Sequence, residues 1–207
     1  MYAIQADHPL FQELRLGLFW HCTSPFEYRQ IVKDEFIRPN DGRIQKWGNR
    51  PYACQELGGV SLFDFATESE HKVLNESIKW KQFLGCAKPL TVIIGIDGNR
   101  LFGKLTRFPD NLQNTTGNVI PWVEVCHCGA IPISTFTKFI LVCSADYAHY
   151  SVHEGLTDEI LSKKEKEFEK RVQAIGKKHE GKYTDAQIKM QKTIELARQL
   201  AKEIYQK

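Results

Sequence analysis

The run Leu90-Thr91-Val92-Ile93-Ile94-Gly95-Ile96 constrains the fold more than any other feature, because branched apolar residues follow one another almost without interruption. A run this short and this rich in β-branched side chains favours a strand over a helix. Comparable runs at residues 16–22, 60–65, 119–126 and 136–143 predict further strands. Few helices separate these strands, so the sequence predicts an α+β fold with a mixed, mostly antiparallel sheet.

Two helices are expected among the strands. Ser24 precedes Pro25, and a hydroxyl cap followed by proline is a typical helix start. This pattern predicts a helix over residues 25–34. Its inward-facing residues are expected to be Phe26, Ile31 and Val32. A second helix is expected at residues 71–84.

The composition changes at about residue 154, where proline and most aromatic residues give way to Lys, Glu, Gln and Ala. We therefore predict two parts, a β-rich domain over residues 1–153 and a charged α-helical hairpin over residues 154–207. Apolar residues recur at helical spacing on both sides of Gly181, namely Leu161, Phe168, Val172, Ile175, Ile194, Ala197, Ala201 and Ile204. So narrow a stripe needs a partner surface, either within its own chain or on another copy through a helical bundle.

Charge and composition exclude several classes of protein. The net charge is +3, but residues 155–207 hold 13 Lys/Arg against 9 Asp/Glu and the rest of the chain holds 15 against 16. The β-rich part is therefore not a basic nucleic-acid-binding surface on net charge. No apolar run approaches the ~20 residues that cross a bilayer, and the N-terminus lacks a secretory signal, so a cytoplasmic protein without membrane contact is expected.

The six cysteines predict neither a disulfide framework nor a metal site. They are scattered through segments of core-like composition, where free cysteine behaves as a small apolar residue. Cys126-His127-Cys128 is the one cluster, and no second Cys/His pair stands at zinc-like spacing. We therefore expect no metal.

Three separate segments carry residues suited to chemistry. His21 ends the first strand, Ser61 follows Gly58-Gly59 in the second, and Glu124 lies in the apolar run 119–126. A carboxylate in so apolar a strand is expected to be buried, and a buried charge is paired or functional. His21 taken singly is more typical of a structural histidine.

Together these segments resemble the His–Tyr–Glu branch of the ADP-ribosyltransferases, which includes poly(ADP-ribose) polymerases and DarT-type DNA-modifying toxins. Residues 18–24, Leu-Phe-Trp-His-Cys-Thr-Ser, are similar to the first motif of that family. Residues 59–63 stand where the second motif stands, and residues 121–124 followed by 130–133 resemble the strand of the catalytic glutamate. The resemblance covers residues 16–143 and implies a split mixed or antiparallel sheet with few helices.

The resemblance also implies NAD as co-substrate and a role for each matching residue. Cleavage of the nicotinamide–ribose bond develops positive charge on the ribose, which Glu124 would stabilise. His21 would bind ribose hydroxyls of NAD, and the backbone of Cys22 would hold the nicotinamide amide. The other cofactor-binding candidates are Thr23 and Ser61 for their hydroxyls, Arg43 and Arg50 for the pyrophosphate, and Tyr52 and Phe63 for a stacking ring.

Two departures from the family pattern define an alternative. Cys22 follows the histidine where glycine is common, and Ser61 stands where the second motif has tyrosine. The alternative is a catalytically inactive relative that binds a partner through the C-terminal helices. A metal-dependent nuclease is less favoured, because no two carboxylates stand at metal-binding spacing on one strand.

The acceptor of ADP-ribose is open at this stage. Trp122 stands two residues before Glu124, where arginine-modifying transferases carry Glu or Gln, so arginine is disfavoured. Nucleic acid, another protein side chain, and water (as in an NAD glycohydrolase) remain as acceptors.

Overall fold

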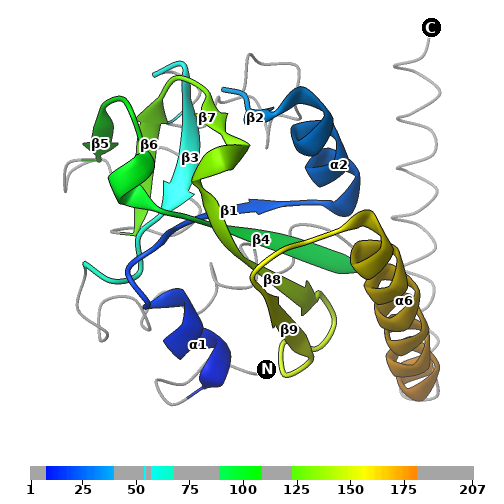
Figure 1. The fold of residues 1–207 in the computed structure, drawn as a ribbon. Helices are drawn as coiled ribbons and strands as arrows, with labels where there is room; N and C mark the ends of the chain where they lie inside the picture. Colours follow the sequence, from blue (N-terminus) through cyan, green and yellow to red (C-terminus); the bar gives the residue numbers. More distant parts are fainter. Residues whose placement is uncertain (1–7, 40–53, 55–56, 68–88, 109–122, 181–207) are drawn as a thin grey trace, which may run out of the picture. The chain divides into compact units, whose positions relative to one another are not determined.

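The computed structural model describes residues 8–39, 54, 57–67, 89–108 and 123–180 of the 207-residue chain. Seven strands form one sheet in the order β5-β6-β3-β1-β4-β8-β9, and β2 pairs with β7 in a separate ladder (Figure 1). Every pairing between the described strands is antiparallel. The α+β class and the mostly antiparallel sheet are therefore confirmed.

The strands of the large sheet are β1 (Phe19–Thr23), β3 (Gly59–Phe63), β4 (Leu90–Ile96), β5 (Leu105–Arg107), β6 (Glu124–Cys128), β8 (Phe136–Cys143) and β9 (Tyr150–His153). The small ladder consists of β2 (Phe36–Ile37) and β7 (Ile131–Pro132). The described α-helices are α1 (Pro9–Leu14), α2 (Pro25–Asp34) and α6 (Asp158–Glu180). Single 3₁₀ turns lie at Gly98–Arg100 and Ile133–Thr135.

Strand β4 lies at the centre of the core. All of its residues are buried, and it pairs with β1 on one side and β8 on the other. Such a strand has no face in water, which explains why its sequence is continuously apolar instead of alternating. The strands predicted at residues 90–96 and 136–143 coincide with β4 and β8.

Helix α2 begins and ends where the sequence predicts. The Ser24 hydroxyl accepts from the Glu27 N–H at 3.2 Å, and the Glu27 carboxylate accepts from the Ser24 N–H at 3.1 Å. This reciprocal capping box satisfies two N–H groups that the helix itself leaves unpaired. Local side-chain chemistry therefore sets the start of α2.

The predicted inward face of α2 is wrong for two residues. Phe26 is 70% exposed and Val32 is 45% exposed, whereas Pro25 and Tyr28 are buried. The hydroxyl of Tyr28 donates to the carbonyl of Leu156 at 3.0 Å, so the helix turns its Tyr28 side toward the segment that leads into α6. A long-range contact thus decides which of several apolar positions is covered.

Helix α1 and strands β5, β7 and β9 are short elements that the sequence does not predict. Helix α1 buries Leu10, Phe11 and Leu14, and the Leu14 carbonyl accepts the indole N–H of Trp20 at 2.8 Å. A helix of six residues is too short to show a periodic pattern. Helix α1 is therefore stabilised by its contacts with the core and not by the helix propensity of its residues.

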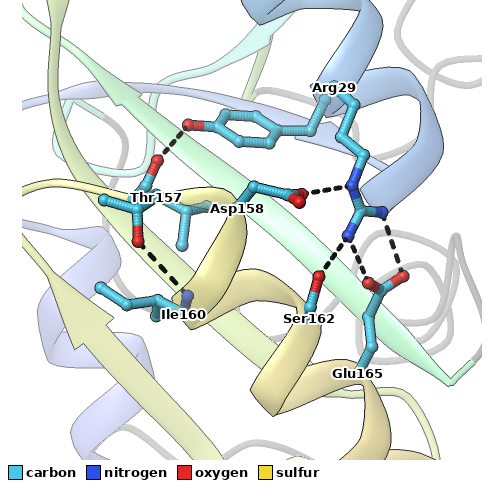
Figure 2. Close-up of polar contacts among 8 residues, drawn as sticks. Arg29, Thr157, Asp158, Ile160, Ser162 and Glu165 are labelled. Atoms are coloured by element: carbon cyan, nitrogen blue, oxygen red, sulfur yellow. Dashed lines mark hydrogen bonds and ion pairs between the residues drawn. The ribbon is translucent and has the colours of Figure 1, made fainter.

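Arg29 attaches the first part of α6 to α2 (Figure 2). Its Nε lies 2.5 Å from Oδ1 of Asp158, and its Nη2 lies 2.6 Å from Oε2 of Glu165 and 3.1 Å from Oγ of Ser162. The hydrogen bonds to Glu165 and then Asp158, and to a smaller extent the charges of the two carboxylates, raise the pKa of Arg29. Three side chains on one face of α6 therefore bind a guanidinium group that stays charged at ordinary pH.

The contacts divide the chain into a unit of residues 1–169 and a unit of residues 170–207, and the division falls within α6. Leu161 and Phe168, the first members of the predicted helical stripe, are 0% and 2% exposed. Residues 181–207 lie outside the described residues, as do the predicted helix at 71–84 and the start of the predicted strand at 119–122. The boundary between residues 1–153 and 154–207 stays a prediction.

Within the described ranges, no helix is both long enough and apolar enough to span a membrane.

Glycine in place of Glu35 is expected to stabilise the protein. Glu35 follows α2 in the left-handed conformation, with φ 63°. That conformation costs a residue with a side chain about 1–2 kcal/mol relative to glycine. Glycine loses more conformational entropy on folding, which offsets part of this gain in stability. Glu35→Gly should raise the free energy of unfolding by about 0.5–1 kcal/mol in urea denaturation.

Asp34→Gly is the matched control, because Asp34 is the last residue of α2. Glycine in a helix costs up to about 1 kcal/mol, so this variant should be destabilised. Destabilisation by Glu35→Gly as well would contradict the prediction.

Candidate active site

Three neighbouring strands carry the residues singled out in the sequence. His21 lies on β1, Ser61 on β3 and Glu124 on β6, and β3 runs between the other two strands. His21 and Ser61 are 40 positions apart in the sequence, and Ser61 and Glu124 are 63 apart. Strand pairing therefore brings the three segments together.

Ser61 contacts both of the other residues. Its hydroxyl donates to Oε1 of Glu124 at 2.5 Å, and its carbonyl oxygen lies 3.1 Å from Nδ1 of His21. In the ladder between β3 and β6, Phe63 lies opposite Glu124 and Ser61 opposite Cys126. Ser61 and Glu124 are therefore diagonal neighbours on one face of the sheet.

His21 contacts Ser61 at the point where β1 and β3 cease to pair. In the described residues β1 pairs with β3 at Trp20 alone, opposite Phe63, although all of β1 pairs with β4. Continued pairing would place Cys22 opposite Ser61 and turn His21 to the other face of the sheet. That pairing ends at Trp20, and the imidazole contacts the main-chain carbonyl of Ser61, not the side chain that binds Glu124.

The imidazole of His21 is neutral at pH 7. Burial lowers the pKa of His21, and the opposing influences of the Ser61 carbonyl and the Glu27 carboxylate are smaller. A carbonyl oxygen can only accept a hydrogen bond, so the neutral ring carries its proton on Nδ1. Nε2 is then a hydrogen-bond acceptor, suited to a hydroxyl group.

Glu124 is a buried carboxylate, as the sequence predicts. It is 2% exposed, and the three residues that follow it on β6 are buried too. Burial, with the negative charge of Glu124 as a further cause, raises the pKa of the nearby Cys54 thiol. A positive charge that develops beside this carboxylate would be poorly screened by water and therefore strongly stabilised.

A second carboxylate near His21, that of Glu27, is absent from the sequence prediction. Its Oε2 accepts from the Ser24 hydroxyl at 2.6 Å and from the Thr23 hydroxyl at 3.3 Å. Burial alone would raise the pKa of Glu27, but the bonds from Ser24 and Thr23 lower it overall. The Ser-x-x-Glu spacing from Ser24 to Glu27 is the signal that could have found it.

The remaining predicted site residues are placed differently. Cys22 is half-buried on β1, and Thr23 is buried with its hydroxyl bound to Glu27. Phe63 is 4% exposed and stacks on Phe65 in the core, away from any open surface, so its role as a stacking ring stays a prediction. Three of the predicted residues lie outside the described residues: Arg43, Arg50 and Tyr52.

His127, between two cysteines, is engaged with backbone on both sides. Its Nδ1 lies 3.2 Å from the carbonyl oxygen of Gly129, and its Nε2 lies 3.1 Å from that of Phe102. The Phe102 contact joins the loop before β5 to β6, the Gly129 contact lies within the turn after β6, and a neutral ring donates to only one of these two carbonyls. Nowhere in the part of the chain that the structure describes do three His, Cys, Asp or Glu side chains gather as metal ligands would.

Comparison with known proteins identifies no relative of this chain. No family model, no curated protein and no solved structure matches it. The functional argument therefore depends on the geometry of β1, β3 and β6.

Acidification is expected to destabilise the protein through His21. The folded state lowers the pKa of His21, whereas the unfolded chain titrates near the model value of 6.5. As the pH falls below about 6.5, the unfolded state gains a proton that the folded state resists, and the free energy of unfolding falls. Urea denaturation at pH about 7 and about 5.5 should show this loss.

His21→Asn should reduce that pH dependence, because asparagine can still donate to Ser61 but does not titrate. His153 also has a pKa that is lowered by burial and by Lys164. His153→Asn is therefore the comparison, and it should remove only the part of the pH dependence that His153 contributes. An unchanged pH dependence in His21→Asn would show that His21 does not contribute.

Proposed function

We propose that this protein is an NAD-dependent ADP-ribosyltransferase with His21, Ser61 and Glu124 in its active site. The link through Ser61 is the observation that supports the proposal most. The three segments that resemble the family motifs are far apart in sequence, yet Ser61 contacts His21 through its carbonyl and Glu124 through its hydroxyl, across adjacent strands. Short motifs that matched the family only by chance would not be expected to lie on adjacent strands in the folded chain.

Glu124 would stabilise the ribose as the nicotinamide leaves. The bond between nicotinamide and ribose breaks with its electron pair going to nicotinamide, and the ribose acquires oxocarbenium character, as in glycoside hydrolysis. A negative charge 2% exposed to water acts on that positive charge with little screening. The attraction is greater in the transition state than in bound NAD, which is the condition for catalysis.

Ser61 and His21 would hold the two reacting parts in place. The Ser61 hydroxyl fixes one oxygen of Glu124, so the carboxylate needs no reorientation during the reaction. The neutral His21 ring offers Nε2 to a ribose hydroxyl of NAD. The backbone of Cys22, next to it on β1, would hold the nicotinamide amide.

The acceptor would be a macromolecule, either nucleic acid or a protein side chain other than arginine. Trp122, whose place before Glu124 argues against arginine, lies outside the described residues. Nicotinamide release from NAD with no macromolecule present would instead identify water as the acceptor and the protein as an NAD glycohydrolase.

Incubation with NAD tests the proposal. We expect the wild-type protein to release nicotinamide and NAD to raise its melting temperature, since a ligand of the folded state stabilises it. His21→Asn should weaken both effects, because asparagine offers no acceptor equivalent to Nε2. His153→Asn, on β9, is the matched control and should behave as wild type. Neither release nor a thermal shift in the wild type would refute the proposal.

The second candidate is a catalytically inactive module that binds a partner, or a second copy, through its C-terminal helices. Residues 170–207 form a contact unit of their own, which favours it. Val172 and Ile175, both half-buried on α6, belong to the apolar stripe. Analytical ultracentrifugation of the full chain should then show an assembly that Val172→Glu with Ile175→Glu disrupts, and a monomer in both proteins would reject self-association.

A further inference from the structure

Two cysteine side chains, those of Cys54 and Cys126, lie against each other near Glu124. The thiol of Cys126, on β6, donates to the carbonyl of Cys54 at 3.8 Å, and the thiol of Cys54 donates to the carbonyl of Val125 at 3.7 Å. The Val125 carbonyl belongs to the peptide group that joins it to Cys126, so each thiol lies against the main chain of the other cysteine. Cys54 and Cys126 pack together in one buried cluster with Phe108, and Cys128 follows Cys126 two positions along β6, on the same face of the strand.

The main chain leaves room for these sulfur atoms. Gly59 of β3 lies opposite Cys128 and next to Cys126, and a Cβ atom at Gly59 would come within 2.2 Å of the Cys126 sulfur. A single buried cysteine such as Cys143 is explained by its apolar character alone. Two cysteines that pack against each other, in a space that a glycine keeps open, go beyond that explanation.

Cys54, Cys126 and Cys128 differ in their exposure to solvent. Cys54 is 2% exposed and Cys126 is 0% exposed, whereas Cys128 at the end of β6 is only half-buried. A small oxidant therefore meets Cys128 first.

We infer that Cys54 and Cys126 form a redox-active pair that closes to a disulfide when a hydroperoxide oxidises Cys128. The inference does not rest on the proposed function, because it concerns thiols whose contacts are already present in the folded chain.

The reaction balances in three steps. The Cys128 sulfur attacks one oxygen of the hydroperoxide, the O–O bond breaks, and a sulfenic acid and water (from hydrogen peroxide) form. The Cys126 sulfur attacks that sulfur, the S–O bond breaks, and a second water leaves with the Cys126 proton. The Cys54 sulfur then attacks Cys126, and Cys128 leaves as a thiol. In total, two thiols and one peroxide give one disulfide and two waters.

The final exchange follows from strand geometry. Cys126 and Cys128 are two positions apart on one strand, so their Cβ atoms stand about 6–7 Å apart, whereas a relaxed disulfide needs about 3.5–4.5 Å. A strained bond exchanges readily with a third thiol, and Cys54 is in contact with Cys126. Burial raises the pKa of Cys54 and of Cys126, so the exchange should accelerate as the pH increases.

Closure of this disulfide would act on Ser61. The Ser61 hydroxyl donates to Glu124. Ser61 also lies opposite Cys126 in the ladder. Oxidation draws the sulfur of Cys126 toward Cys54 and so changes the packing beside Ser61.

The test is hydrogen peroxide treatment of the folded full-length protein, alkylation of the remaining thiols, and peptide mass spectrometry. We expect a crosslink between the peptides of Cys54 and Cys126 that dithiothreitol reverses, while Cys143 stays alkylated. Cys128→Ala should slow formation of the crosslink at least tenfold, and Cys143→Ala, the matched control, should leave its rate unchanged.

Two results would overturn the inference. One is free thiols at Cys54 and Cys126 when Cys128 has already advanced to its sulfinic acid. The other is a crosslink between Cys126 and Cys128 that persists instead of passing to Cys54. Both are read from the wild-type protein, so neither depends on the folding of a variant.

Discussion

Alanine at position 59 is expected to lower the free energy of unfolding by about 3 kcal/mol or more. The added methyl group would lie 2.2 Å from the sulfur of Cys126 and 2.7 Å from the carbonyl oxygen of His127. Neither atom is the mobile end of a flexible side chain. The sulfur is packed against Cys54, and the carbonyl belongs to β6, so relief requires β3 and β6 to separate.

Urea denaturation measures this loss, and Gly155→Ala provides the control. No atom lies within 4 Å of a Cβ built at Gly155, so that variant should stay within about 0.5 kcal/mol of wild type. Combining Gly59→Ala with Cys126→Ala removes the contact with sulfur but not the one with the carbonyl, so partial recovery is expected. A loss below about 1 kcal/mol in Gly59→Ala would mean that β3 and β6 are less tightly paired than described.

Glutamine at position 124 is expected to reduce the rate of nicotinamide release by about 10²–10³-fold, if the proposed function holds. Glutamine has nearly the shape of glutamate and retains an oxygen that can accept from the Ser61 hydroxyl, so the fold should persist. What it lacks is the negative charge. Because the charge acts mainly in the transition state, kcat should fall while KM changes little.

Glu154→Gln is the matched control for this experiment. Glu154 is exposed and follows β9, outside the candidate site, so its variant should release nicotinamide at the wild-type rate. Ser61→Ala should lie between the two, since it frees the Glu124 carboxylate without removing its charge. An active wild type whose Glu124→Gln variant keeps its rate within about threefold would remove Glu124 from the mechanism.

The elements that the sequence predicts well are those with strong local signals. β4 and β8 are long apolar runs, and they occur within the predicted limits. Helix α2 is set by the Ser24 cap, Pro25 and Glu27, all within one turn of its start. Each of these signals acts over a few residues, so it can be recognised without knowledge of the tertiary structure.

The elements that the sequence does not predict depend on distant partners. Strand β5 has three residues and is defined by its pairing with β6. Strand β9, of four residues, is likewise defined by its pairing with β8. In α2 the covered side is set by contacts of Tyr28 and Arg29 with the segment around α6, more than 120 positions away. No local pattern could have chosen that side over the one bearing Phe26.

The amino-acid sequence by itself determined the α+β class, the central strands, the start of α2 and the burial of the Glu124 carboxylate, because hydrophobic pattern and capping chemistry act between near neighbours. Only the tertiary structure decided that His21 contacts the carbonyl of Ser61 while Glu124 binds its hydroxyl, and that Cys54 lies against Cys126. Those contacts depend on strand order and register, and on the point where β1 leaves β3. These are properties of pairing between remote segments, which no single segment encodes.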